Sequence, residues 1–110
     1  MNAHYAQLPQ DQEGYLLNPA DWNQQIAQEI AVSMDIQMTE AHWEIVRFVR
    51  AYYESHDSVP ELRVTLKHLK SIEPKKATRK YVYTLFPFGY GQQACKIAGM
   101  RMPRKLMLDV

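Results

Sequence analysis

The chain has 110 residues, 46% of them hydrophobic and 23% charged, with a formal net charge of +1. This composition is typical of one small globular domain, and we assign residues 1–110 to it. The near-neutral charge argues against general nucleic-acid binding, and the absence of an apolar run of about 18 residues argues against a membrane span. The single cysteine rules out an internal disulfide framework and favours a reducing cytoplasm.

Residues 1–10 form an N-terminal segment without the basic and apolar regions of a secretory signal. Two semi-apolar stretches, 5–8 and 14–17, flank turn-forming residues, which predicts a small β-hairpin. Asn18 and Pro19 then supply a cap and a first helical residue. Since the apolar residues Trp22, Ile26 and Ile30 recur every four positions, we expect one helix over 19–33.

Thr39 is the predicted cap of the clearest helix, in which two apolar ridges run through residues 43–53. An apolar arc this wide predicts a central helix, with Arg47, Arg50 and Glu54 on its exposed face. The next helix is expected to begin with a capping box, in which Glu61 follows Ser58 by three residues. Its apolar face carries Leu62, Leu66 and Leu69.

Helical spacing resumes over 77–86, and Pro87 ends it. After a loop, a last short helix is predicted over 92–100, and the basic, Pro-containing residues 101–110 are predicted to form a mobile C-terminal arm. The expected fold is therefore mainly α. It is an orthogonal bundle of about five helices with a small N-terminal β-hairpin and a flexible arm.

The sequence predicts no metal or cofactor site. The four histidines are scattered and do not pair with other ligands at metal-binding spacings: His4, His42, His56 and His68. His42, at a predicted helix start, is better explained by packing or capping. The glycines of the 89–91 loop lack the preceding strand and the third glycine of a phosphate-binding motif.

The basic residues after residue 74 raise the question of DNA binding. The helix over 60–70 and the basic helix that follows have a layout similar to a helix-turn-helix. The candidate phosphate contacts are Lys75, Lys76, Arg79 and Lys80. Two packed helices with a solvated basic rim explain the same pattern more simply.

Cys95 is the candidate site for chemistry, and the residues alone leave two interpretations open. A lone cysteine in an apolar segment commonly serves as a small buried side chain. The neighbouring Lys96, the basic arm and a nearby helix N-terminus would instead favour a reactive thiolate.

Linked motifs along the chain resemble those of the DsrC/TusE family. They comprise residues 11–16, 42–50 with Tyr53, Pro60 with Arg63, 81–83, 85–87 with Gly89, and 93–100. This family contains the gamma-subunit-like protein of dissimilatory sulfite reductase and the sulfur-relay protein of tRNA 2-thiouridine synthesis. The resemblance covers residues 11–103. It implies a helical bundle with an N-terminal hairpin and a mobile arm whose cysteines carry sulfur as persulfide or trisulfide.

This sequence departs from the family pattern at the principal thiol. Leu106 stands where the penultimate cysteine belongs, whereas Cys95 matches the upstream cysteine of the DsrC type. The chain therefore resembles a DsrC-like paralogue that cannot close the intramolecular disulfide. Tyr90 also stands where the family often has proline.

Two hypotheses follow. In the first, the protein is a cytoplasmic sulfur-relay accessory protein that carries a persulfide on Cys95. It would be at most a sulfurtransferase or carrier, without a cofactor, and its partners would be sulfite reductase or TusA/TusBCD-like sulfurtransferases. In the alternative, it is a regulatory paralogue without sulfur chemistry that binds DNA through the basic helices.

Overall fold

The computed structural model describes residues 3–103. Five helices in this part of the chain confirm the mainly α prediction: α1 (Gln24–Ser33), α2 (Glu40–His56), α3 (Leu62–Ile72), α4 (Arg79–Leu85) and the π-helix η4 (Tyr90–Cys95). The same residues also hold three single 3₁₀ turns: η1 (Tyr5–Gln7) and η2 (Pro19–Asp21) precede α1, and η3 (Pro74–Lys76) lies between α3 and α4.

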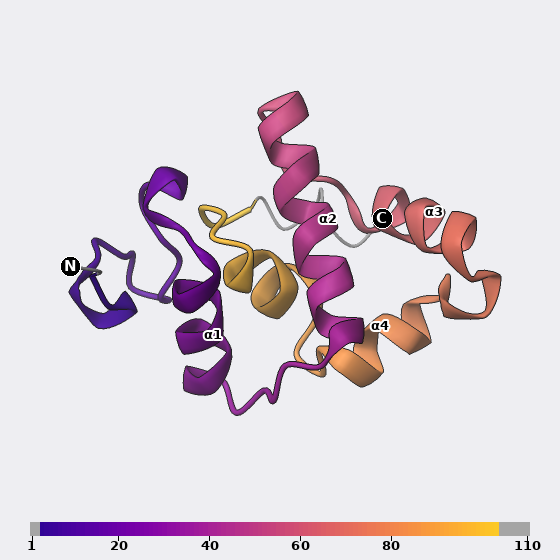
Figure 1. Ribbon diagram of the computed structural model, residues 1–110, viewed down its shortest axis with the longest axis horizontal. Helices are drawn as coiled ribbons and strands as arrows, with labels where there is room; N and C mark the ends of the chain where they lie inside the picture. The colour runs from indigo at the N-terminus through magenta and orange to yellow at the C-terminus, as the bar shows by residue number, and fades with distance from the viewer. Residues whose placement is uncertain (1–2, 104–110) are drawn as a thin grey trace.

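Helix α2 runs through the middle of the molecule, with α1 and η4 on one side and α3 and α4 on the other (Figure 1). Both η4 and α3 pack against it. Ile45, Val46 and Val49 of α2 have no exposed surface, which confirms the central helix that the apolar ridges predicted. No helix within residues 3–103 has the length and apolar character that a membrane span needs.

The predicted N-terminal β-hairpin is wrong: residues 3–103 contain no strand, and the reversal holds one antiparallel bridge, between Gln10 and Leu16. The flanking residues cannot extend it. Tyr5 begins a 3₁₀ turn, and Pro9 has no N–H to donate. A side-chain bond from the Tyr5 hydroxyl to the carbonyl oxygen of Gly14 closes the loop instead.

The single helix expected over 19–33 is divided in two. Asn18 caps η2 by accepting from the N–H of Ala20, and Asn23 caps α1 by accepting from the N–H of Ile26. The second cap starts a new helix and leaves Trp22 outside it. Ile26 and Ile30 are buried as predicted, but Trp22 turns towards the C-terminal segment.

The cap of α2 is confirmed and the capping box of α3 is wrong. Thr39 precedes α2 in extended conformation, and its side chain and backbone both interact with His42. Helix α3 begins at Leu62, so Glu61 is its N-cap and not its third residue. Pro60 is held before the helix, where its carbonyl oxygen accepts a 2.7 Å hydrogen bond from the buried Tyr90 hydroxyl.

The C-terminal helices are shorter than expected. Thr78 caps α4 by accepting from the N–H of Tyr81, and the helix ends before Pro87. The last helical segment starts at Tyr90, two residues earlier than predicted, and gives way to a turn at Ala98. Most of the predicted arm, including Leu106, lies outside the described residues.

Candidate functional site around Cys95

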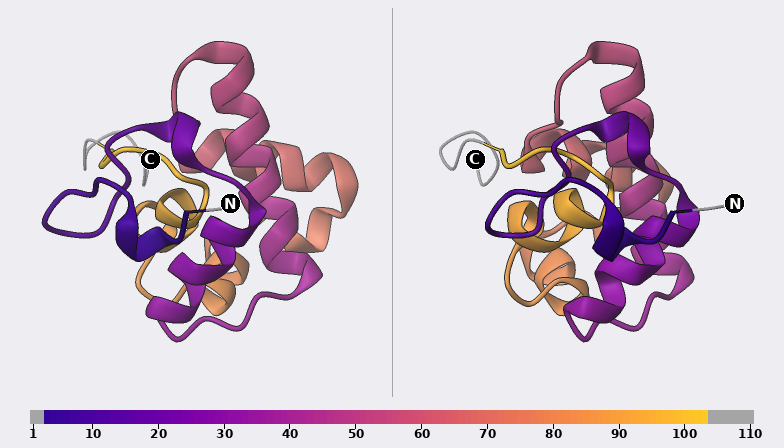
Figure 2. Two further views of the ribbon diagram at one scale, coloured as in Figure 1. Left: turned by 60° about the vertical axis from the view of Figure 1, so that its left-hand side comes forward. Right: turned by 90° about the vertical axis from the view of Figure 1, so that its left-hand side faces the viewer.

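Cys95 lies at the end of η4 with no exposed surface. The segment around it is buried as well: Gln93, Ala94, Ile97, Ala98 and Met100 are each at most 2% exposed. Figure 2 shows this last helical segment beneath the N-terminal part of the chain. The thiol therefore sits in the core, between α2 and the N-terminal segment, and not on a mobile end.

Trp22 and Arg50 hold the segment that follows Cys95. The indole Nε1 of Trp22 donates a 2.7 Å hydrogen bond to the carbonyl oxygen of Ile97. The Arg50 guanidinium donates to the carbonyl oxygens of Ala98 and Pro19, at 3.3 and 2.8 Å, and lies 4.7 Å from the centre of the Trp22 ring. These contacts join residues 97–98, which lead into the arm and are called its base below, to α2 and η2.

Gly99 ends this segment in a conformation that favours glycine, with φ +80°. A Cβ atom at this position would overlap the Trp22 ring. The backbone therefore lies directly on the indole, which explains both the turn after Ile97 and the direction in which the arm leaves.

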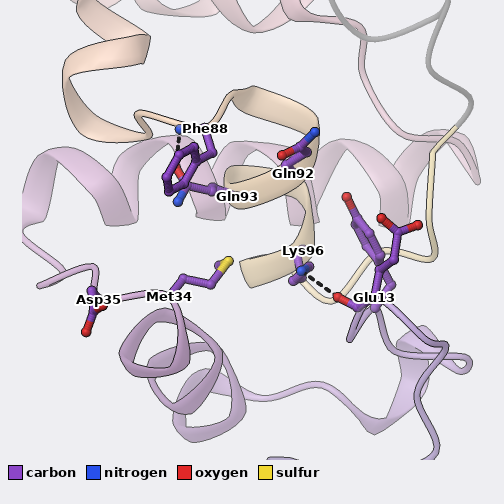
Figure 3. A pocket seen from close by; sticks show the side chains of 8 residues that line it. Glu13, Met34, Asp35, Phe88, Gln92, Gln93 and Lys96 are labelled. Atoms are coloured by element: carbon purple, nitrogen blue, oxygen red, sulfur yellow. Dashed lines mark hydrogen bonds between the residues drawn. The ribbon is translucent and has the colours of Figure 1, made fainter.

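Tyr15 covers the other side of the segment. Its hydroxyl donates to the carbonyl oxygen of Gly91 at 3.1 Å, and the Lys96 ammonium lies 4.8 Å from its ring centre. The ammonium also donates to the carbonyl oxygen of Glu13 at 2.6 Å (Figure 3). Burial, followed by the nearby Cys95 and two acidic residues, raises the pKa of Tyr15 to about 12. The phenol is therefore a stable donor at neutral pH.

This geometry differs from the environment predicted for a reactive thiolate. Cys95 is the last residue of η4, so the helix N-terminus, at Tyr90, is at the opposite end. The Lys96 ammonium is directed at Glu13 and Tyr15. A thiol enclosed in this way behaves as a small apolar side chain, so sulfur chemistry requires the segment to open.

The four candidate DNA contacts do not form a recognition helix. Lys75 and Lys76 belong to η3, whereas Arg79 and Lys80 start the seven-residue α4. Lys76 pairs with Glu73 at 3.4 Å, and its pKa is raised by Tyr81 and by this partner. The predicted helix-turn-helix therefore finds no support in the described residues.

His42 is structural, as the sequence indicated. It is 7% exposed, and both ring nitrogens are used: one by Thr39 and the other by the Leu85 carbonyl oxygen. Within residues 3–103, no three His, Cys, Asp or Glu side chains are grouped so that they could hold a metal ion.

Sequence reasoning missed the roles of Tyr15, Trp22 and Arg50. Arg50 was expected on the exposed face of α2, but its side chain is 12% exposed. An arginine inside a wide apolar arc is a usable signal, since such a residue needs acceptors from elsewhere in the fold. Its partners at Pro19 and Ala98 lie 31 and 48 residues away, and no local pattern indicates them.

Comparisons with known proteins agree along nearly the whole chain. A sulfurtransferase TusE of Yersinia pseudotuberculosis is 42% identical over 96 residues, covering 86% of this chain and 89% of the relative. A TusE homologue of Haemophilus influenzae is 34% identical over 108 residues, covering 97% and 99%.

Solved structures give the same result. The oxidized gamma-subunit of dissimilatory sulfite reductase (DsrC) from Archaeoglobus fulgidus superimposes with a TM-score of 0.82 at 32% identity, covering 88% of this chain and 90% of that one. DsrC of Allochromatium vinosum gives a TM-score of 0.78 at 40% identity, covering 86% of each chain. The family profile described as "DsrC like protein" matches residues 2–107, and the chain belongs to this DsrC-like family.

Proposed function

We propose that this protein works in sulfur relay and that Cys95 is its sulfur-bearing residue. The observation that supports the relay role is the match to proteins named sulfurtransferase TusE, which extends over 86–97% of this chain. Membership of the family over residues 2–107 supports the same role. DNA binding is not favoured, because neither the relatives nor the basic residues point to it.

The proposed reaction is a thiol–persulfide exchange. The Cys95 thiolate attacks the outer sulfur of a donor persulfide, a new S–S bond forms at Cys95, and the donor leaves as a thiolate. One S–S bond replaces another, so no external oxidant or reductant is needed. A reducing cytoplasm suits such a thiol, and the partners are protein donors and acceptors: sulfite reductase or TusA/TusBCD-like sulfurtransferases.

Because Cys95 has no exposed surface, loading requires local opening. Gly89, with φ +109°, precedes η4, and Gly99 follows it. These two glycines bound a segment whose main chain is held by side chains of Trp22, Arg50 and Tyr15. Docking of a partner that competes for these bonds would expose the thiol.

Intact-mass measurement tests the carrier role. Incubation with a protein persulfide donor is expected to add about 32 Da to the wild-type chain and nothing to Cys95→Ser. A small alkylating agent serves as the control for access. If Cys95 is alkylated under these conditions but gains no sulfur, the carrier role is refuted.

The complete burial of Cys95 favours a second candidate, in which the protein docks on relay proteins without carrying sulfur. In that case, Cys95→Ser retains binding to a relay protein and its effect on that protein's sulfur transfer. Under the carrier role, Cys95→Ser retains binding but abolishes the effect. Pull-down and a transfer assay, done side by side with both forms, distinguish the two.

A further inference from the structure

A hollow of about 350 Å³ lies beside the segment that holds Cys95, between the N-terminal loop and the end of α1. Its lining combines aromatic, thioether, amide and charged side chains: Glu13, Tyr15, Met34, Asp35, Phe88, Gln92, Gln93 and Lys96. Figure 3 shows Phe88 and Gln93 above Met34 and Asp35, with Glu13 and Lys96 on the opposite side.

Gln93 supplies a hydrogen-bond donor for which residues 3–103 offer no acceptor. The residue is 2% exposed, and its Oε1 accepts the backbone N–H of Phe88 at 2.9 Å. Among the described residues, no acceptor is bonded to its Nε2. In the described part of the chain, no fully buried side-chain nitrogen or oxygen lacks a hydrogen-bond partner, so this Nε2 keeps some exposed surface. Gln93 lines the hollow, where water or a ligand can accept from the amide.

Phe88 supplies an exposed but fixed apolar surface. Its side chain is 74% exposed, the largest exposed fraction among the large hydrophobic residues of the described chain. Its backbone is held by Gln93, and Gly89 follows in a left-handed conformation. An aromatic ring presented on a constrained backbone loses little entropy on binding, which is typical of an interface anchor.

The charges of the hollow favour a cation. Its lining has two carboxylates, Glu13 and Asp35, and neither forms an ion pair with a described residue. The one ammonium, on Lys96, already contacts the Glu13 carbonyl oxygen and the Tyr15 ring. Asp35 also destabilises the fold locally. It has φ +57°, and it follows α1, where the helix carbonyl groups disfavour a negative charge.

We propose that this hollow is the docking site for a segment of a partner protein in which an apolar residue is followed by lysine or arginine. The apolar side chain covers Phe88 and Met34, a backbone carbonyl accepts from Nε2 of Gln93, and the cationic side chain faces Asp35. The assignment rests on this lining alone and does not depend on sulfur transfer by Cys95.

Nuclear magnetic resonance of the full-length ¹⁵N-labelled chain tests the site with capped peptides. Acetyl-Leu-Lys-Lys-amide, at up to about 10 mM, is expected to shift the Gln93 side-chain amide and the backbone amides of Asp35 and Phe88. Gln93→Glu identifies the side-chain resonance by its loss. Acetyl-Leu-Glu-Glu-amide and acetyl-Ser-Lys-Lys-amide are expected to bind more weakly, because each lacks one of the two features.

Matched variants separate the site from general surface effects. Asp35→Asn is expected to weaken binding about two- to fivefold, as loss of an exposed charge contact does. Asp57→Asn, the control, should leave affinity unchanged, although Asp57 has φ +56° and also follows a helix. Phe88→Ala should abolish the shifts, whereas Ile72→Ala, at a residue 51% exposed on α3, should not.

Three results would overturn the proposal. Equal binding of the basic and acidic peptides excludes the charge assignment. Shifts that persist in Phe88→Ala, or no shifts with any peptide, exclude the site. Tighter binding of a free peptide with the sequence of residues 104–110 would identify this chain's own C-terminal segment, and not a partner protein, as the occupant.

Discussion

His42 joins the start of α2 to the end of α4, because its Nε2 donates a 2.9 Å hydrogen bond to the carbonyl oxygen of Leu85. Its Nδ1 accepts from the backbone N–H and the hydroxyl of Thr39, at 3.1 and 2.8 Å. The ring also meets Phe86 edge-on at 5.2 Å. One side chain thus caps α2 and closes α4 against it.

We expect His42→Ala to lower the free energy of unfolding by about 2–4 kcal/mol, since it leaves a cavity and unpairs buried polar groups. Urea unfolding followed by circular dichroism measures this loss. His56→Ala is the control, because His56 is exposed and its ring bonds to and stacks on Tyr52 of its own helix. It should cost less than about 1 kcal/mol. Equal losses would contradict the structural role of His42.

Gly99→Ala tests the contact between the arm's base and Trp22. The substitution adds left-handed strain of about 1 kcal/mol and a clash with the indole, so the total loss should exceed about 2 kcal/mol. Gly89→Ala reports backbone strain without a clash: Gly89 has φ +109° and ψ 158°, a region used almost only by glycine, and the added Cβ would meet Tyr83 only at ordinary contact distances, 3.7 Å or more. Urea unfolding should rank Gly99→Ala as the more damaging substitution.

A double-mutant cycle identifies the source of the additional loss. If the indole causes it, Gly99→Ala should cost less in a Trp22→Ala background than in the wild type. Additive losses in the double variant would show that backbone strain alone accounts for the effect.

The sequence predicts those features that depend on neighbouring residues. Thr39 and His42 lie three positions apart, so the cap of α2 was accessible to pattern analysis, as was the apolar arc of that helix. The site depends on long-range contacts, such as Trp22 with Ile97, 75 residues apart, and Tyr15 with Gly91, 76 residues apart. The hairpin prediction is wrong for a related reason. The turn residues indicate that the chain reverses, but the flanking residues form one bridge and not the series of hydrogen bonds that two paired strands need.

We expect Glu29 to make the N-terminal segment sensitive to acid. Hydrogen bonds from Gln25, His4 and the backbone N–H of Tyr5 lower its pKa from 4.5 to about 2. A carboxylate whose pKa is lower in the folded state stabilises the fold at pH values above its ordinary pKa of 4.5. This contribution is lost as the pH falls towards about 2.

Hydrogen exchange at Tyr5–Gln7 should therefore accelerate between about pH 4.5 and 2, after correction for intrinsic rates. Glu29→Gln is expected to remove this dependence and to raise exchange at neutral pH. Glu40→Gln, which removes an exposed pairing with Arg47, is the control and should not change it. A persistent pH dependence in Glu29→Gln would assign the effect to another group.

The accessibility of Cys95 determines whether the protein handles sulfur by opening. Cys95 has no exposed surface, so a reagent reaches its thiol only in molecules whose segment is open. At neutral pH, the alkylation rate of Cys95 should therefore equal the rate of a small-molecule thiol of matched pKa multiplied by the fraction of open molecules. Tyr15→Phe keeps the ring but removes the hydrogen bond to Gly91. Such a hydrogen bond contributes about 1 kcal/mol. Alkylation of this variant should therefore be about fivefold faster, because 1.4 kcal/mol corresponds to about tenfold.

Tyr83→Phe is the matched control, since Tyr83 is 38% exposed and forms no side-chain hydrogen bond with a described residue. The slope of the alkylation rate against urea concentration reports the size of the opening. A weak slope indicates that only the segment between Gly89 and Gly99 moves. A slope as steep as that of global unfolding indicates that the whole chain unfolds to expose the thiol. If the wild-type thiol reacts as fast as the small-molecule thiol, or if both tyrosine variants accelerate it equally, Tyr15 does not close the site.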